Sequence, residues 1–198
     1  MTEPSPELDE ILDTLKKCAA VLRDADIPFM VGGGIAAWAR GGPESVNDLD
    51  LVVRPSDAES ALATLESVGL RGEHPPEGWL LKAWDGEVLV DLIFKPQGLE
   101  IDDEILGRAE QLNVKAMEVP VMPIADVMCS KLLALNERWL DYDQLLQMAR
   151  ACREQVDWDE VRGRTAASPF ARAFFEIVDG LGITGERPPA SPARVAGS

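Results

Sequence analysis

Asn47-Asp48-Leu49-Asp50-Leu51-Val52-Val53 is a short apolar run that contains two carboxylates one residue apart. Successive side chains of a β-strand point to opposite faces, so Asp48 and Asp50 share one face and the two leucines share the other. Neighbouring carboxylates repel each other and raise each other's pKa unless a cation lies between them. Because hard oxygen ligands favour Mg²⁺ or Mn²⁺, this stretch predicts a strand that carries a divalent metal site.

A glycine cluster, Gly32-Gly33-Gly34, precedes the carboxylate pair by a short stretch. Glycine lets the backbone approach a phosphate group without interference from a Cβ atom. The spacing is not that of the G-x-G-x-x-G dinucleotide motif, and no Walker lysine follows it. Since Mg²⁺ usually binds together with substrate phosphates, the glycines and the carboxylates predict a metal-dependent phosphoryl-transfer site. In that site Gly32, Gly33 and Gly34 contact the phosphate.

Asp91 is the one charged residue in the apolar stretch Val88-Leu89-Val90-Asp91-Leu92-Ile93-Phe94. A buried carboxylate without a partner costs free energy. Two kinds of partner would satisfy it: a lysine, Lys82 or Lys95, or a metal shared with the other two aspartates. Three carboxylates on neighbouring strands can hold two divalent ions, which activate an attacking hydroxyl and stabilise a leaving pyrophosphate.

Length, composition and charge narrow the class of protein. The chain of 198 residues is long enough for one core with a small appended part. Its 46% hydrophobic and 27% charged residues are ordinary for a globular protein, and no apolar run reaches the ~20 residues that span a bilayer. The acidic N-terminus has no signal-peptide pattern, so we expect a cytoplasmic protein without membrane contact. The net charge of −16 weakens attraction to nucleic acid.

Residue spacing predicts an α/β (α+β) fold, with a mixed β-sheet core, flanking helices and a helical C-terminal part. We expect the core over residues 1–122, the helical part over 123–184 and a disordered tail over 185–198. Strands are expected at 28–31, 49–53, 79–84, 87–94 and 114–121, with Asp85-Gly86 as a type I′ hairpin turn. Helices are expected at 6–25, 35–40, 57–68, 101–108, 125–137, 139–153, 157–164 and 169–180.

The ordered set of a Gly-Gly turn, the strand Asp48-Leu49-Asp50 and a third strand carboxylate at Asp91 resembles the nucleotidyltransferase superfamily of the DNA-polymerase-β type. The match covers roughly residues 27–95. The resemblance implies an enzyme that transfers a nucleoside monophosphate from an NTP to an acceptor hydroxyl. It also implies that the three aspartates bind Mg²⁺ or Mn²⁺ and that Asp91 activates the nucleophile.

A second stretch, Asp126 to Arg138, is similar to a helix of AbiEii/MenT-type nucleotidyltransferase toxins, in which a Lys-x-x-Ala-Leu segment precedes an arginine and one or more aspartates. By that resemblance Lys131 binds the NTP triphosphate, and Asp141, or Asp143 in its place, is a further catalytic residue. The resemblance also implies the 3′ end of tRNA as acceptor and an antitoxin protein as partner. From the residues alone, Lys131 also fits a solvent-facing charge on a helix, and Asp141 fits a loop between two helices.

Two departures from the family keep alternative functions open. Position 34 is glycine where many relatives have serine or threonine, and Glu44-Ser45-Val46-Asn47 lacks the basic residue that many relatives carry before the aspartate pair. One alternative is a small-molecule nucleotidyltransferase resembling the aminoglycoside-modifying enzymes, because an acidic protein attracts polycationic drugs. The other is a catalytically inactive nucleotide-binding or antitoxin-like module, which the weakened phosphate loop favours.

Overall fold

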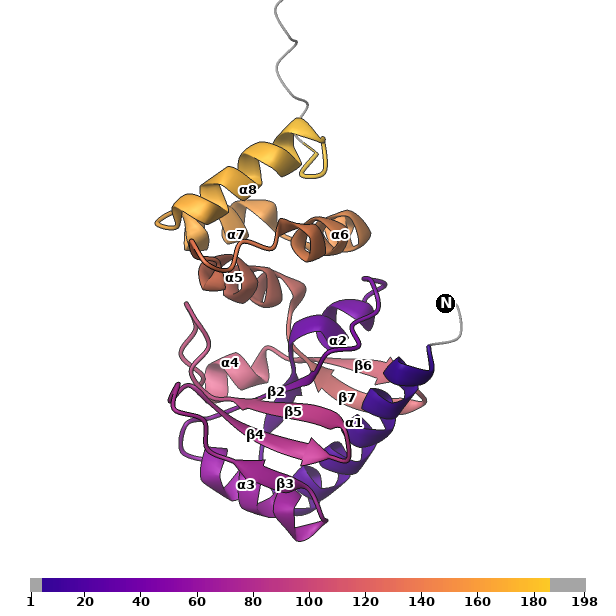
Figure 1. Ribbon diagram of the computed structural model, residues 1–198. Coiled ribbons are helices and arrows are strands. Elements are labelled where there is room, and N and C mark those ends of the chain that lie inside the picture. The colour runs from indigo at the N-terminus through magenta and orange to yellow at the C-terminus, as the bar shows by residue number, and fades with distance from the viewer. Residues whose placement is uncertain (1–4, 186–198) are drawn as a thin grey trace, which may run out of the picture.

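The computed structural model describes residues 5–185 and shows a seven-stranded mixed sheet followed by a stack of helices (Figure 1). The strands are β1 (Phe29–Val31), β2 (Leu49–Val53), β3 (Arg71–Glu73), β4 (Leu80–Asp85), β5 (Val88–Ile93), β6 (Glu110–Val114) and β7 (Met117–Val121). Their order in the sheet is β3-β4-β5-β2-β1-β7-β6. Neighbours are antiparallel except for the β2–β5 and β1–β7 pairs, which are parallel. The predicted fold class is confirmed.

Two helices, α1 (Pro6–Asp24) and α3 (Ala58–Ser67), pack together on one face of the sheet (Figure 1). Apolar residues recur every three or four positions along α1 and therefore form one buried stripe. The stripe comprises Leu8, Ile11, Leu12, Leu15, Cys18, Ala19 and Leu22. The Ser5 side chain accepts a hydrogen bond from the backbone N–H of Leu8 at 3.3 Å and so caps the helix where the sequence predicts its start.

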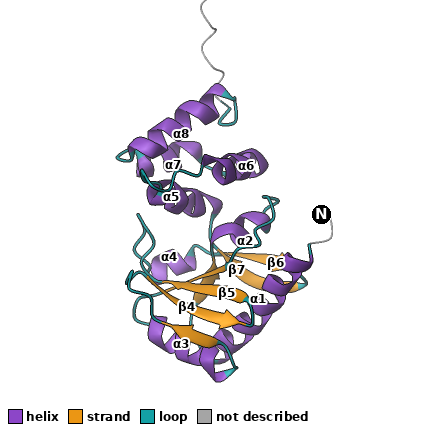
Figure 2. Cartoon of the chain, viewed as in Figure 1, coloured by secondary structure: helices purple, strands orange, loops and turns teal. Residues whose placement is uncertain are grey.

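The helical part contains α5 (Ile124–Ala134), α6 (Tyr142–Cys152), α7 (Trp158–Thr165) and α8 (Pro169–Gly180), stacked beyond the sheet (Figure 2). Helix α5 contacts the other three and also α2 (Gly33–Trp38), which packs on β2. No helix within residues 5–185 has both the length and the apolar character that a membrane span requires. The tail predicted over 185–198 lies, apart from its first residue, outside the described part of the chain.

The hairpin β6–β7 replaces the single strand predicted over 114–121. Its turn is formed by Lys115 and Ala116, whose φ angles of 48° and 60° lie in the left-handed region. Glycine or asparagine normally marks such a turn, so this sequence carries no turn signal there. The three-residue strand β3 also went unpredicted, because so short a segment shows no periodicity.

The β4–β5 hairpin is where the sequence predicts it, but its turn differs. Asp85 pairs with Val88, which leaves Gly86 and Glu87 as the two turn residues. Gly86 has a φ of 62°, whereas Glu87 does not adopt a positive φ. A glycine with positive φ at the first turn position is the type II′ pattern, not the predicted type I′.

The helices predicted at 125–137 and 139–153 are both shorter in the structure, which forms a loop over residues 135–141. Asn136 and Trp139 exchange two backbone hydrogen bonds of 3.1 Å in this loop, so the chain satisfies its polar groups without helix. The Asp141 side chain accepts a hydrogen bond from the backbone N–H of Asp143 at 3.0 Å and caps α6.

A buried ionic cluster connects the helical part to the sheet part. The Asp126 side chain, in the first turn of α5, is fully buried and accepts a hydrogen bond of 2.6 Å from Arg164 on α7. Arg108, which directly follows α4 (Asp103–Gly107), lies 3.5 Å from the second carboxylate oxygen. Glu160 contacts both arginines. Because α5 also carries Lys131, this cluster fixes a helix on which the candidate site depends.

Replacement of Asp126 by alanine is expected to lower the free energy of unfolding by about 3 kcal/mol, because two arginines lose their buried counter-charge. Urea denaturation monitored by circular dichroism measures the change. Glu154→Ala is the control, because Glu154 is 82% exposed and its bridge to Arg153 is a surface pair. A loss as small as that of the control would contradict a stabilising role for Asp126.

Candidate active site

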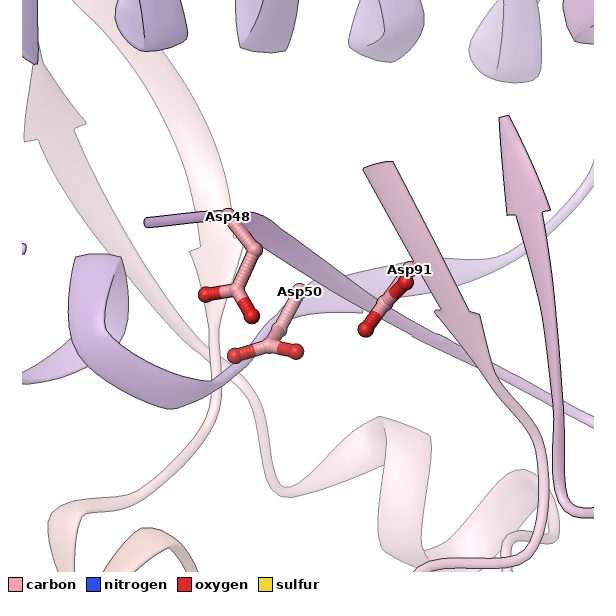
Figure 3. Close-up of side chains that lie close together, drawn as sticks. All are labelled: Asp48, Asp50 and Asp91. Atoms are coloured by element: carbon pink, nitrogen blue, oxygen red, sulfur yellow. The ribbon is translucent and has the colours of Figure 1, made fainter. Parts of the chain in front are cut away.

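Three aspartates converge where β2 pairs with β5. They are named the aspartate triad and comprise Asp48, Asp50 and Asp91. Asp48 directly precedes β2, Asp50 lies within it, and the parallel pairing of β2 with β5 places Asp50 directly beside Asp91. Figure 3 shows the three carboxylates grouped in one place. One oxygen from each lies within 4.8 Å of the others. The structure therefore brings together the three residues that the sequence predicts as metal ligands.

Negative charge within the aspartate triad disfavours the ionisation of Asp48 and Asp50. Burial, followed by the negative charge of Asp48, raises the pKa of Asp50 to about 7. Burial and the charge of Asp91 raise the pKa of Asp48 as well. The ammonium groups of Lys131 and Lys82 lower both pKa values but do not cancel the increase. The site therefore has too little positive charge to balance its carboxylates, which is the condition under which a divalent cation binds.

Of the two lysines that the sequence offers as ion-pair partners of Asp91, Lys82 and Lys95, the structure pairs Asp91 with Lys82. The two residues are opposite each other in the β4–β5 pair, and Lys82 Nζ donates to Asp91 Oδ1 at 2.8 Å. Three carboxylates beside two ammonium groups still leave a negative balance. Their hard oxygen donors fit Mg²⁺ or Mn²⁺, so the residues present are suited to the metal that the sequence predicts.

The glycine turn packs directly against the aspartate triad. The backbone N–H of Gly32 donates to the carbonyl oxygen of Asp50 at 2.9 Å. Gly33 has a φ of 52°, and a Cβ atom there would overlap a carboxylate oxygen of Asp50. A Cβ atom on Gly34 would overlap the hydroxyl of Ser45. Glycine is therefore required here both for backbone conformation and for close packing.

A cavity of about 730 Å³ opens over the aspartate triad and continues to α5 and α6. Its lining includes Gly33 and Gly34 but not Gly32. The remaining lining residues are Ser45, Asn47, Asp48, Asp50, Val52, Trp79, Asp91, Ile93, Lys95, Pro96, Gln97, Met122, Val127, Ser130, Lys131, Ala134 and Gln144. The cavity therefore lies between the sheet and the helical part, and charged, polar and apolar residues line it.

Lys131 lies on α5 and lines this cavity, as its predicted role requires. Its Nζ donates to Gln144 Oε1 at 3.1 Å, and no carboxylate of the described residues lies within 4 Å of it. Asp141 caps α6, and Asp143 accepts a hydrogen bond from Gln147; neither lines the cavity. A catalytic role for either aspartate stays a prediction.

Sequence reasoning missed Ser45. Relatives of the predicted superfamily place a hydroxyl at position 34, and this chain places a buried hydroxyl from Ser45 against that position instead. Trp79 and Gln144 also line the cavity without having been predicted. Trp79 and Gln144 lie far from the aspartate pair in sequence, and Ser45, three residues before Asp48, contacts the Gly34 position only through the folded path of the chain, so no local pattern identified them.

The comparison with protein families agrees with this geometry. Residues 11–171 match the family model described as nucleotidyl transferase of unknown function (DUF2204). A comparison with curated protein sequences gives no match.

The structure also resembles solved nucleotidyltransferase structures. One is ANT(2″)-Ia in complex with adenylyl-2″-tobramycin, with a TM-score of 0.62 and 18% identity over 82% of this chain and 98% of that chain. Another is a solution structure of the antibiotic-resistance factor ANT(2″)-Ia, with a TM-score of 0.62 and 17% identity over 85% and 94%. A third is an antigenic nucleotidyltransferase-like protein from Paracoccidioides brasiliensis, with a TM-score of 0.53 and 14% identity over 92% and 94%. At these identities the likeness shows a common fold.

Replacement of Asp50 by asparagine is expected to stabilise the metal-free protein at about pH 8. The folded-state pKa of about 7 lies above the ordinary value, so this group removes stability as the pH rises from about 4 to about 7. The variant does not lose this stability. Its free energy of unfolding should exceed that of the wild type by about 1–2 kcal/mol, which raises its melting temperature by about 2–8 °C. Thermal unfolding with a chelator present measures the difference, which should vanish near pH 4.

Excess Mg²⁺ supplies the control for Asp50→Asn. The cation should raise the melting temperature of the wild type at about pH 8 and leave that of the variant nearly unchanged. Equal melting temperatures of the two metal-free proteins at about pH 8 would contradict the repulsion described for the aspartate triad.

Gly33→Ala is expected to weaken Mn²⁺ binding by about tenfold or more, because the added methyl group displaces the Asp50 carboxylate. Electron paramagnetic resonance of free Mn²⁺ measures the affinity. Gly41→Ala is the matched control: Gly41 also has a positive φ, 89°, but no atom lies within 4 Å of its Cβ position. Equal losses in both variants would mean that backbone strain, and not the overlap with Asp50, causes the effect.

Proposed function

Because this chain belongs to the family described as nucleotidyl transferase of unknown function (DUF2204), we propose that it transfers a nucleoside monophosphate from an NTP to an acceptor hydroxyl with Mg²⁺ or Mn²⁺ bound at the aspartate triad. The observation that carries this proposal is the clustering of three carboxylates beside a glycine turn that has no side chains between backbone and cavity. Such a cluster, without sufficient positive charge of its own, favours a divalent cation.

The NTP is proposed to lie with its triphosphate between the glycine turn and α5. Gly33, Gly34, Ser45 and Ser130 are among the residues that line the cavity. Lys131 lines it as well, and its ammonium group has no carboxylate partner among the described residues that would compete with a phosphate. This arrangement supports the role predicted for Lys131 as a phosphate ligand.

The proposed reaction balances without a further co-reactant. The acceptor oxygen bonds to the α-phosphorus, the bond from the α-phosphorus to its bridging oxygen breaks, and pyrophosphate leaves. The hydroxyl proton passes to a carboxylate oxygen of Asp91. Divalent cations at the aspartate triad would polarise the attacking hydroxyl and stabilise the charge on the leaving group.

The acceptor is a separate question from the reaction. The sequence resemblance to nucleotidyltransferase toxins predicts the 3′ end of tRNA, with an antitoxin protein as partner. The common fold with ANT(2″)-Ia, whose structure holds adenylyl-2″-tobramycin, suggests a small-molecule acceptor as the alternative. An inactive module is the remaining alternative, and the presence of the aspartate triad together with Lys131 favours an active enzyme over it.

Label transfer from each α-³²P-labelled NTP tests the proposal. The protein and Mg²⁺ are incubated separately with total tRNA, with tobramycin and with a protein-free cell extract of small molecules. We expect one pool to become labelled with release of pyrophosphate, and Asp48→Asn to reduce the rate by at least about a hundredfold. Labelled tRNA would support the toxin hypothesis. Failure of every NTP to bind in the presence of Mg²⁺ would refute nucleotidyl transfer.

Two lysine variants test where the triphosphate binds. Lys131→Met should weaken binding of the Mg²⁺–NTP complex by about tenfold or more, since a charged hydrogen-bond donor to phosphate is lost. Lys16→Met removes the same charge from an exposed position on α1 and should leave the affinity unchanged. Equal affinities of the two variants would contradict the placement of the triphosphate at α5.

A further inference from the structure

The sheet places the glycine turn and Trp79 on opposite sides of the aspartate triad. The strand order β4-β5-β2-β1 runs across the middle of the sheet. Trp79 directly precedes β4, Asp91 is on β5, Asp50 is on β2, and the glycine turn follows β1. All of them except Gly32 line one cavity. The cavity thus has two ends, with the aspartate triad between them.

The chemistry of nucleotidyl transfer assigns a role to each end, and this step rests on the proposed function. Attacking and leaving oxygens lie roughly in line on opposite sides of the phosphorus. If the leaving pyrophosphate lies at the glycine turn and Lys131, the attacking hydroxyl approaches from the β5 and β4 side. The acceptor therefore contacts the end of the cavity that Trp79 lines.

The acceptor end is mainly apolar, with one lysine and one glutamine and no carboxylate among its described lining residues. It is lined by five residues, named the acceptor wall: Trp79, Ile93, Lys95, Pro96 and Gln97. Trp79 is 40% exposed, although large apolar side chains are usually buried. The ends of β4 and β5 hold it in place, because its backbone carbonyl accepts hydrogen bonds of 3.1 Å from the N–H groups of Phe94 and Lys95. An exposed indole on a fixed backbone offers a flat apolar surface to a ligand.

The cavity lacks the carboxylates that a polycationic acceptor would need. Among the described residues, its only acidic lining residues are those of the aspartate triad, which face the proposed cations. The other charged lining residues are Lys95 and Lys131. The acidic residues that give the chain its net charge of −16 therefore lie mostly outside the cavity, and none of those in the described part of the chain lies at the acceptor end. An ammonium-rich molecule would meet lysine and apolar groups there.

We infer that the acceptor is a hydroxyl compound with a planar, apolar face and no cationic groups, bound with that face against Trp79. Stacking on the indole positions the molecule, and the absence of acidic groups on the acceptor wall excludes polyamines and aminoglycosides. This class of acceptor differs from the one suggested by the acidity of the whole chain.

A binding experiment on the nucleotide-loaded protein tests this inference. The protein is saturated with Mg²⁺ and a non-hydrolysable α,β-methylene NTP, whose binding is measured in the same sample. Saturation-transfer NMR then compares p-nitrophenyl β-D-glucoside with methyl β-D-glucoside, which lacks the planar ring, and with tobramycin. We expect the aryl glucoside to bind at least about tenfold more tightly than the other two.

Tryptophan variants locate the binding. Trp79→Ala should weaken binding of the aryl glucoside at least about fivefold and leave nucleotide affinity unchanged, whereas Trp79→Phe should retain most of the affinity. Trp139→Ala is the control, because Trp139 is 75% exposed and does not line the cavity. Tighter binding of tobramycin, no binding of the aryl glucoside or a loss of nucleotide affinity in Trp79→Ala would overturn the inference. Absence of Mg²⁺–nucleotide binding in the wild type would instead refute the proposed function.

Discussion

Repulsion among three carboxylates is the physical constraint on which this structure depends. The parallel pairing of β2 with β5 fixes Asp50 beside Asp91, and the chain entering β2 adds Asp48. Burial and repulsion raise the pKa of Asp50 to about 7, so the folded environment disfavours the ionised form of this side chain. Such an arrangement lowers stability unless a cation compensates for it. The elements around the aspartate triad leave room for such a cation. The glycine turn lies on one side, and Lys82 from β4 and Lys131 from α5 lie on the other sides.

Local sequence patterns were sufficient to predict that Asp48, Asp50 and Asp91 would lie together. Aspartates at alternate positions of an apolar strand must share a face, and a lone aspartate in an apolar hairpin strand must find a partner. Each conclusion needs only the geometry of one strand. That Asp91 would lie on a strand beside that of Asp48 and Asp50 was an expectation from the metal site that three neighbouring carboxylates can form, and the pairing of β2 with β5 confirms this position. The nucleotidyltransferase fold was predictable for the same reason: its motif lies in a few strands that are close in sequence.

The residues that sequence reasoning missed depend on distant contacts or on local hydrogen bonds that override periodicity. Ser45 reaches Gly34 only because α2 turns the chain back on itself. Trp79 reaches the cavity because β4 and β5 end together. Asp141, predicted from the resemblance as a site residue, caps α6 by accepting a hydrogen bond from the backbone N–H of Asp143, and its catalytic role stays a prediction. The two predicted helices extended to residue 137 and began again at residue 139, whereas paired backbone hydrogen bonds form a loop over residues 135–141 instead.

The ion pair between Lys82 and Asp91 has a consequence for the order in which ligands accumulate in the cavity. A bare divalent ion that approaches Asp91 competes with an ammonium group already bonded to one of its two carboxylate oxygens, so its own affinity is reduced. A triphosphate arriving with the ion offers new negative oxygens to both the ion and the lysine. Cation and nucleotide would then strengthen each other's binding by the same factor, as thermodynamic linkage requires. Under this coupling the resting protein would remain largely metal-free, and its occupancy would follow the supply of nucleotide.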